Sequence, residues 1–108
     1  MKLVIAIVNN DDSAVVSSAL TKEGFFVTKL STTGGFLMVG NTTLLIGTED
    51  GRVEEIKRTL SEFSATRMKT VPSTDAFGRT QGPHDTPKEV TVGGATYFVL
   101  DVEEYGKV

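Results

Sequence analysis

The only histidine of the chain, His84, stands directly before Asp85. Acid–base catalysis and metal binding both use a histidine beside a carboxylate. Either chemistry needs convergent partners, and the sequence has no cysteine, no second histidine and no His-x-x-x-His or Glu-x-x-His spacing on a helix. We therefore expect no catalytic residue, no metal and no cofactor, and a nucleotide hydrolase that uses His84 and Asp85 is the weakest alternative.

The stretch Thr32–Asn41 has a different chemistry, because three glycines are combined with apolar residues. Glycines let backbone N–H groups approach an anion such as phosphate. The apolar residues 36–39 between them need cover, which a neighbouring subunit or a flat purine would supply. The sequence has no P-loop and no Gly-x-Gly-x-x-Gly pattern. The stretch predicts a nucleotide-binding loop, with an ordinary hairpin loop as the alternative.

Six strands and two helices are expected around this stretch. Apolar and β-branched runs predict strands over Leu3–Val8, Phe25–Leu30, Thr42–Ile46, Arg67–Val71, Lys88–Val92 and Ala95–Val102. The first helix is expected to follow an N-cap at Asp11 or Asp12 and to end at Gly24. The second follows an N-cap at Asp50, with apolar positions three and four residues apart from Val53 to Phe63 and a Glu54–Arg58 pair on its surface.

This order of elements predicts an α+β, ferredoxin-like antiparallel sheet with two helices on one face. Gly93-Gly94 predicts a tight turn that makes the last two strands a hairpin and adds a C-terminal strand to the sheet. The 108 residues suffice for a single domain, 1–108. The loop at 32–41 and a long loop at 72–87, which contains all three prolines and which we expect to be mobile without ligand, belong to it.

Charge excludes several classes of partner. Eleven basic and fourteen acidic residues give a net charge of −3, so the chain lacks the broad positive field that DNA, RNA or an anionic membrane surface requires. The apolar N-terminal run is too short for a membrane span or a signal peptide. We expect a cytoplasmic protein.

Residues 28–37, Thr-Lys-Leu-Ser-Thr-Thr-Gly-Gly-Phe-Leu, followed by Gly-Asn-Thr-Thr at 40–43, resemble the signature of the PII-like cyclic-di-AMP receptor family, the DarA and PstA type. Further agreement lies at 5–8, at 47–53 and at 92–100, so the resemblance covers the whole chain. It implies a bacterial PII-like fold assembled as a homotrimer, with one cyclic dinucleotide between neighbouring subunits.

The resemblance also implies a set of ligand-binding residues. These are Val27 through its backbone, Thr28, Gly35, Phe36, Leu37, Asn41, Gly47 and Phe98. Phe36 and Leu37 would sandwich an adenine, Asn41 would read its polar edge, Thr28 would meet phosphate, and Phe98 would wall the pocket. The chain departs from the family pattern at Gly24 and Phe26, where an amide and a cation are expected, and at Lys107, where a polar contact is expected.

The sequence therefore predicts a non-enzymatic receptor for cyclic di-AMP. Ligand binding would order the loops at 32–40 and 72–87 and change what an unidentified downstream protein can bind. Because Gly24 and Phe26 remove expected polar contacts, a PII-like regulator of another nucleotide or a small anion is the first alternative.

Overall fold

The structure, a computed structural model, describes residues 1–30, 40–71 and 88–108. In chain order its elements are β1 (Lys2–Asn9), α1 (Asn10–Lys22), β2 (Phe26–Leu30), β3 (Asn41–Thr48), the 3-10 turn η2 (Asp50–Arg52), α2 (Val53–Ser64), β4 (Arg67–Val71), β5 (Lys88–Val92) and β6 (Ala95–Asp101). The predicted order of strands and helices is confirmed. The two predicted loops lie outside the described residues, apart from Gly40 and Asn41.

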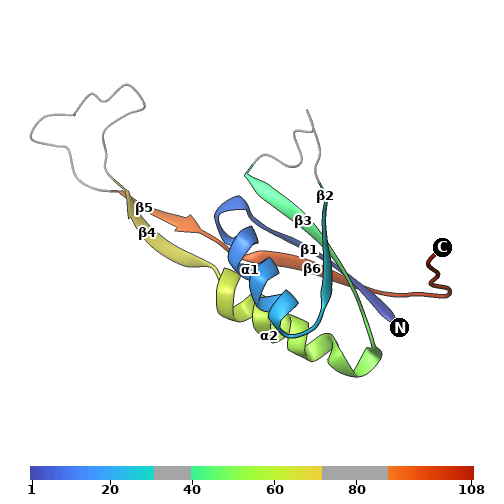
Figure 1. Ribbon diagram of the computed structural model, residues 1–108. Coiled ribbons are helices and arrows are strands. Elements are labelled where there is room, and N and C mark those ends of the chain that lie inside the picture. Colours follow the sequence, from blue (N-terminus) through green and yellow to red (C-terminus); the bar gives the residue numbers. More distant parts are fainter. Residues whose placement is uncertain (31–39, 72–87) are drawn as a thin grey trace, which may run out of the picture.

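Four strands form one antiparallel sheet in the order β2-β3-β1-β6, with both helices packed on one face (Figure 1). Successive side chains of a strand point to opposite faces. Val4, Ala6 and Val8 of β1 point to the helices and are fully buried, together with Leu44 and Ile46 of β3. The α+β, ferredoxin-like sheet with two helices on one face is therefore confirmed.

Helix α1 begins two or three residues earlier than expected. Asn9 is the N-cap, and its side-chain Oδ1 accepts a hydrogen bond from the Asp11 backbone N–H at 2.9 Å. The prediction of a cap at Asp11 or Asp12 was wrong, because Asn9 is an equally good capping residue and comes first. The predicted end is confirmed: the chain leaves α1 at Gly24, whose φ of +94° suits glycine.

Helix α2 has the predicted apolar stripe, with Ile56 and Leu60 buried in the core. Its predicted beginning was wrong, because Asp50 opens η2 and instead pairs with the N-terminal amino group at 2.9 Å. Glu54 forms its salt bridge with Lys57 at 3.0 Å, so the prediction of a pair with Arg58 is not what the structure has. Residues three and four positions apart both lie on one helix face, and here Glu54 pairs with the residue three positions away, Lys57.

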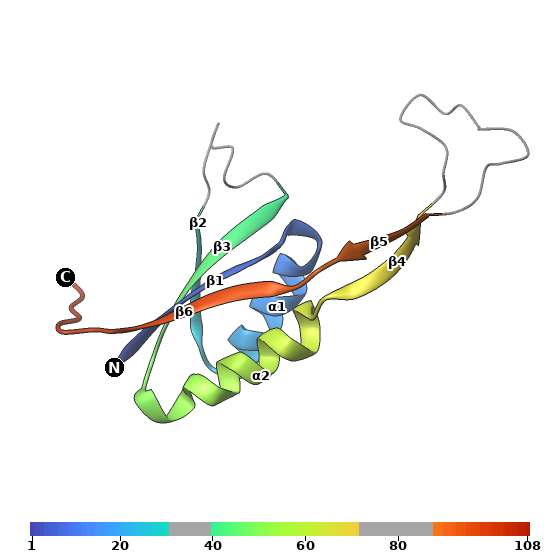
Figure 2. The same ribbon diagram turned by 180° about the vertical axis from the view of Figure 1, so that it is seen from behind.

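The predicted hairpin of the last two strands was wrong. β5 pairs with β4 in a separate two-stranded sheet that projects from the body, and β6 pairs with β1 (Figure 2). Gly93 and Gly94 do have positive φ values, +78° and +91°, but they serve a different contact. The Gly94 N–H donates to the Ser64 carbonyl at 2.5 Å, and a Cβ on Gly93 would lie 2.7 Å from the Ala65 carbonyl oxygen. The glycines let the chain pass the end of α2.

Candidate functional site

A cavity of about 630 Å³ opens on the face of the sheet that the helices leave uncovered. Strand alternation places Phe26 and Thr28 of β2 on this face, opposite Gly47 and Leu45 of β3. The absent side chain of Gly47 leaves space there, with nothing within 4 Å of an added Cβ. Gly47, near the end of β3, therefore leaves room for part of the cavity.

One end of the cavity is rigid. The Arg52 guanidinium lies 4.0 Å from the centre of the Phe25 ring, and its Nη2 donates to the Glu23 carbonyl at 2.8 Å. Arg52 Nε also donates to a Glu55 carboxylate oxygen at 2.8 Å. This hydrogen bond lowers the pKa of Glu55 and raises the pKa of Arg52, so both groups stay charged at neutral pH.

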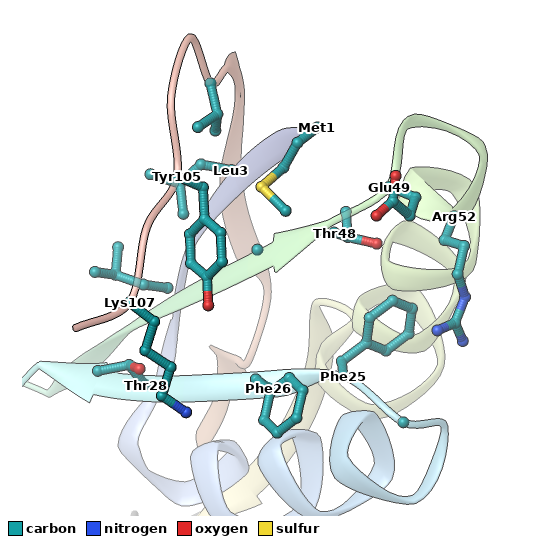
Figure 3. A pocket seen from close by; sticks show the side chains of 14 residues that line it. Met1, Leu3, Phe25, Phe26, Thr28, Thr48, Glu49, Arg52, Tyr105 and Lys107 are labelled. Atoms are coloured by element: carbon teal, nitrogen blue, oxygen red, sulfur yellow. The ribbon is translucent and has the colours of Figure 1, made fainter.

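The opposite wall is the C-terminal segment after β6. Tyr105 and Lys107 extend from it toward β2 and line the cavity with Phe26 and Thr28 (Figure 3). Phe26 is 88% exposed and Tyr105 is 68% exposed, so two aromatic faces stand open to solvent. Open aromatic faces beside a hydroxyl and an ammonium group suit a ligand that joins flat rings to an anion.

Charged groups of both signs border the cavity. Lys107 and Arg52 contribute cations, and Glu49 contributes a carboxylate. Next to Glu49, the N-terminal amino group of Met1 pairs with Asp50, and this hydrogen bond lowers the pKa of Asp50. Lys107 is the cation on the Thr28 side of the cavity, since Arg52 is already bonded to Glu55 at the other end.

The structure brings together only some of the predicted ligand-binding residues. Thr28 and Gly47 line the cavity. Val27 lies on the other face of β2 and packs against the core, which leaves only its backbone for a ligand. Asn41 is at the far end of β3 from Gly47, roughly 20 Å away at the usual rise of a strand.

Phe98 lies on β6, the strand at the opposite edge of the sheet from β2. Its side chain is on the face that the helices leave uncovered. It pairs with Ile5 of β1 and does not line the cavity. Gly35, Phe36 and Leu37, like His84 and Asp85, lie outside the described residues. One chain therefore does not gather Thr28, Asn41 and Phe98 into a single site.

Two groups of residues were not predicted as site residues but line the cavity. Gly24, Phe26 and Lys107 are positions where the sequence departs from the family pattern, and all three lie here. Arg52 and Tyr105 also line the cavity. Arg52 belongs to the stretch 47–53 that resembles the family and Tyr105 to the C-terminal end, but neither was predicted to bind the ligand. The departures themselves were the usable signal.

The described residues, 1–30, 40–71 and 88–108, contain no group of three or more histidine or acidic side chains that could hold a metal ion. Within the same residues no helix has the length and apolar character needed to cross a bilayer.

Comparison with known proteins identifies the family of the chain. The chain matches the family described as "Cyclic-di-AMP receptor" over residues 1–108. A crystal structure described as that of a functionally unknown protein from Pediococcus pentosaceus ATCC 25745 is 39% identical, with a TM-score of 0.76, and the match covers 99% of this chain and 96% of the other. The match over the full length places this chain in the cyclic-di-AMP receptor family.

Proposed function

We propose that the chain is a cytoplasmic, non-enzymatic receptor that binds cyclic di-AMP as a homotrimer, with each ligand between two neighbouring copies. The observation that carries this proposal is the separation of the predicted ligand-binding residues. Thr28 and Gly47 line the cavity, whereas Asn41 and Phe98 lie well outside it. A ligand that contacts all four must lie where two copies of the chain meet.

Each part of the cavity has a counterpart in a cyclic dinucleotide. The Thr28 hydroxyl and the Lys107 ammonium group supply a hydrogen-bond donor and a charge for phosphate. The exposed rings of Phe26 and Tyr105 supply flat surfaces for purine stacking. Asn41, contributed by another copy, supplies an amide for the polar edge of adenine. Ligand binding changes the conformation of the loops at 32–40 and 72–87, and this change determines whether an unidentified partner protein binds there.

A second candidate, a PII-like regulator of another nucleotide or a small anion, is favoured by Gly24 and Phe26. Both line the cavity, so the amide and cation expected there are missing from the site itself and not from a distant surface. A missing charge-assisted hydrogen bond costs about 1.5–3 kcal/mol, or roughly one to two decades of affinity.

Calorimetry with cyclic di-AMP tests the proposal. Separate titrations with cyclic di-GMP, ATP and AMP serve as controls for ligand identity. We expect saturable binding of one cyclic di-AMP per chain and no turnover of any of the four. A folded chain that gives no heat with cyclic di-AMP at high micromolar concentration contradicts the proposal, and selective binding of another nucleotide supports the second candidate.

The double variant Gly24→Asn with Phe26→Arg separates the two candidates further. It restores the expected amide and cation, and we expect cyclic di-AMP to bind roughly ten- to a hundredfold more tightly. Glu54→Gln is the matched control, because it changes the net charge in the same direction at an exposed position outside the cavity. Equal affinity in the wild type and the double variant would mean that phosphate does not lie beside Gly24 and Phe26.

A further inference from the structure

Asn10, the first residue of α1, is hydrogen-bonded to both neighbours of Asn41. Its backbone N–H donates to the Gly40 carbonyl at 2.9 Å, and its side-chain Oδ1 accepts from the Thr42 hydroxyl at 2.5 Å. Asn41 itself is paired with Asn9 in the register of β1 and β3. One turn of the chain therefore contacts three consecutive residues at the beginning of β3.

The turn that carries Asn10 is held from two sides. Asn9 caps α1 through the Asp11 N–H, which fixes the first turn of the helix. Asp12, with a side chain only 8% exposed, accepts hydrogen bonds from both terminal nitrogens of Arg67, at 2.8 and 3.3 Å. A bidentate pair of this kind holds both partners in a defined geometry. Asn10 is thus anchored independently of any ligand.

The beginning of β3 needs such an anchor. Asn41 is exposed and follows Gly40, whose φ of +79° marks a sharp turn into the strand. Among the described residues, the first two residues of β3 pair with β1 but not with β2, and strand ends open locally at little cost in free energy. The two hydrogen bonds to Asn10 oppose this opening on either side of Asn41.

We propose that Asn10 is a positioning residue for base recognition, acting through Asn41 without contacting the ligand. The proposal rests on the proposed function, in which the Asn41 amide meets the polar edge of adenine, where adenine has an amino donor and guanine a carbonyl acceptor. An amide held in one place matches one pattern of donors and acceptors. An Asn41 amide that is free to move can pair with either base, so the preference for cyclic di-AMP over cyclic di-GMP falls. General destabilisation of the fold would weaken the binding of both ligands and leave that preference unchanged.

Thr42→Val and Thr42→Ser test the side-chain half of the contact. Valine has nearly the shape of threonine without the hydroxyl, whereas serine keeps the donor to Asn10. We expect Thr42→Val to weaken cyclic-di-AMP binding roughly two- to tenfold and to reduce the preference over cyclic di-GMP. Thr42→Ser should retain the wild-type affinity and preference.

Asn10→Ala removes the acceptor of the same hydrogen bond. Because the two variants remove one shared bond, Asn10→Ala combined with Thr42→Val should be no weaker than either variant alone. Thr21→Ala is the matched control: it deletes an exposed side-chain hydrogen bond, to the Ser17 carbonyl, near the other end of α1 and leaves the Asn10 contacts in place. It should leave the base preference unchanged.

Hydrogen exchange of the Asn41 and Thr42 backbone amides, measured without ligand, provides a readout that needs no nucleotide. We expect exchange there to be roughly two- to tenfold faster in Asn10→Ala than in the wild type or in Thr21→Ala. Unchanged exchange and unchanged base preference in Asn10→Ala would overturn the role of Asn10. A wild-type chain that binds no cyclic dinucleotide would instead overturn the proposed function, while the exchange result still decides whether Asn10 positions Asn41.

Discussion

The two faces of the four-stranded sheet are similarly apolar, but the described residues cover only one of them. Toward the helices, Val4 and Leu44 are fully buried. On the other face, Phe26 is 88% exposed, Phe98 53% and Leu100 44%. A monomer seldom leaves a large apolar surface open to water, and such a surface usually marks a binding site.

The difference shows what the apolar run of β1 requires. A strand that is apolar at every position is usual where both faces of a sheet are covered. The helices bury Val4, Ala6 and Val8 of β1. On the other face, Leu3, Ile5 and Ile7 remain only half-buried. The proposed homotrimer supplies the second cover, because closed symmetric assembly buries the same surface of each copy.

The largest expected effect separates two neighbouring leucines of β3. Leu44 is buried under the helices and Leu45 is half-buried on the other face. Leu44→Ala should lower the free energy of unfolding by about 2–5 kcal/mol, because it leaves a cavity in the core. Leu45→Ala should cost less in dilute protein, and its cost should grow with protein concentration as copies associate. Urea unfolding at several concentrations measures both, and equal, concentration-independent losses would contradict the comparison.

An intermediate effect is expected on β6, where Phe98 and Tyr97 point to opposite faces. Phe98→Asp would bury a carboxylate without a partner in the proposed subunit contact, so association should weaken by about tenfold or more. Tyr97→Asp introduces the same charge on the helix side, near Lys57, and should leave association unchanged. Sedimentation velocity distinguishes them, and two variants that associate equally would place the contact elsewhere.

The smallest effect is expected at the ion pair between Arg52, which lines the cavity, and Glu55 of helix α2. The hydrogen bond from Arg52 lowers the pKa of Glu55, so its stabilisation is present above the ordinary glutamate pKa and is lost as pH falls through the lowered value. Wild type should unfold at a slightly higher temperature than Glu55→Gln at neutral pH. The difference should shrink as pH falls below the ordinary glutamate pKa and vanish below the lowered pKa of Glu55. Both side chains are partly exposed, so the expected difference in unfolding temperature is small. A difference in unfolding temperature that stays constant across this pH range would show that the ion pair contributes nothing.

Much of the fold could be predicted because hydrophobic period and turn chemistry agree along the chain. The apolar run of β1 and the stripe of α2 each indicate one structure. Caps were less predictable, because Asn9, Asn10, Asp11 and Asp12 are all good capping residues and local chemistry does not choose among them.

The pairing of β5 was not predictable from a local rule. Gly93-Gly94 satisfies the rule for a two-residue hairpin, yet both glycines are required by contacts with Ser64 and Ala65, almost thirty residues earlier in the chain. The residues of the site likewise include some that could be predicted from the sequence and some that could not. Thr28 and Gly47 followed from the family resemblance, whereas the contribution of Arg52 and Tyr105 depends on how β2, η2 and the C-terminal segment meet in space.

Sedimentation equilibrium with and without cyclic di-AMP tests most directly whether the uncovered face is closed by other copies of the chain around the ligand. We expect a particle of three times the chain mass, with one nucleotide bound per chain and tighter association when the ligand is present. A particle that stays monomeric at all concentrations, with or without cyclic di-AMP, would contradict the account.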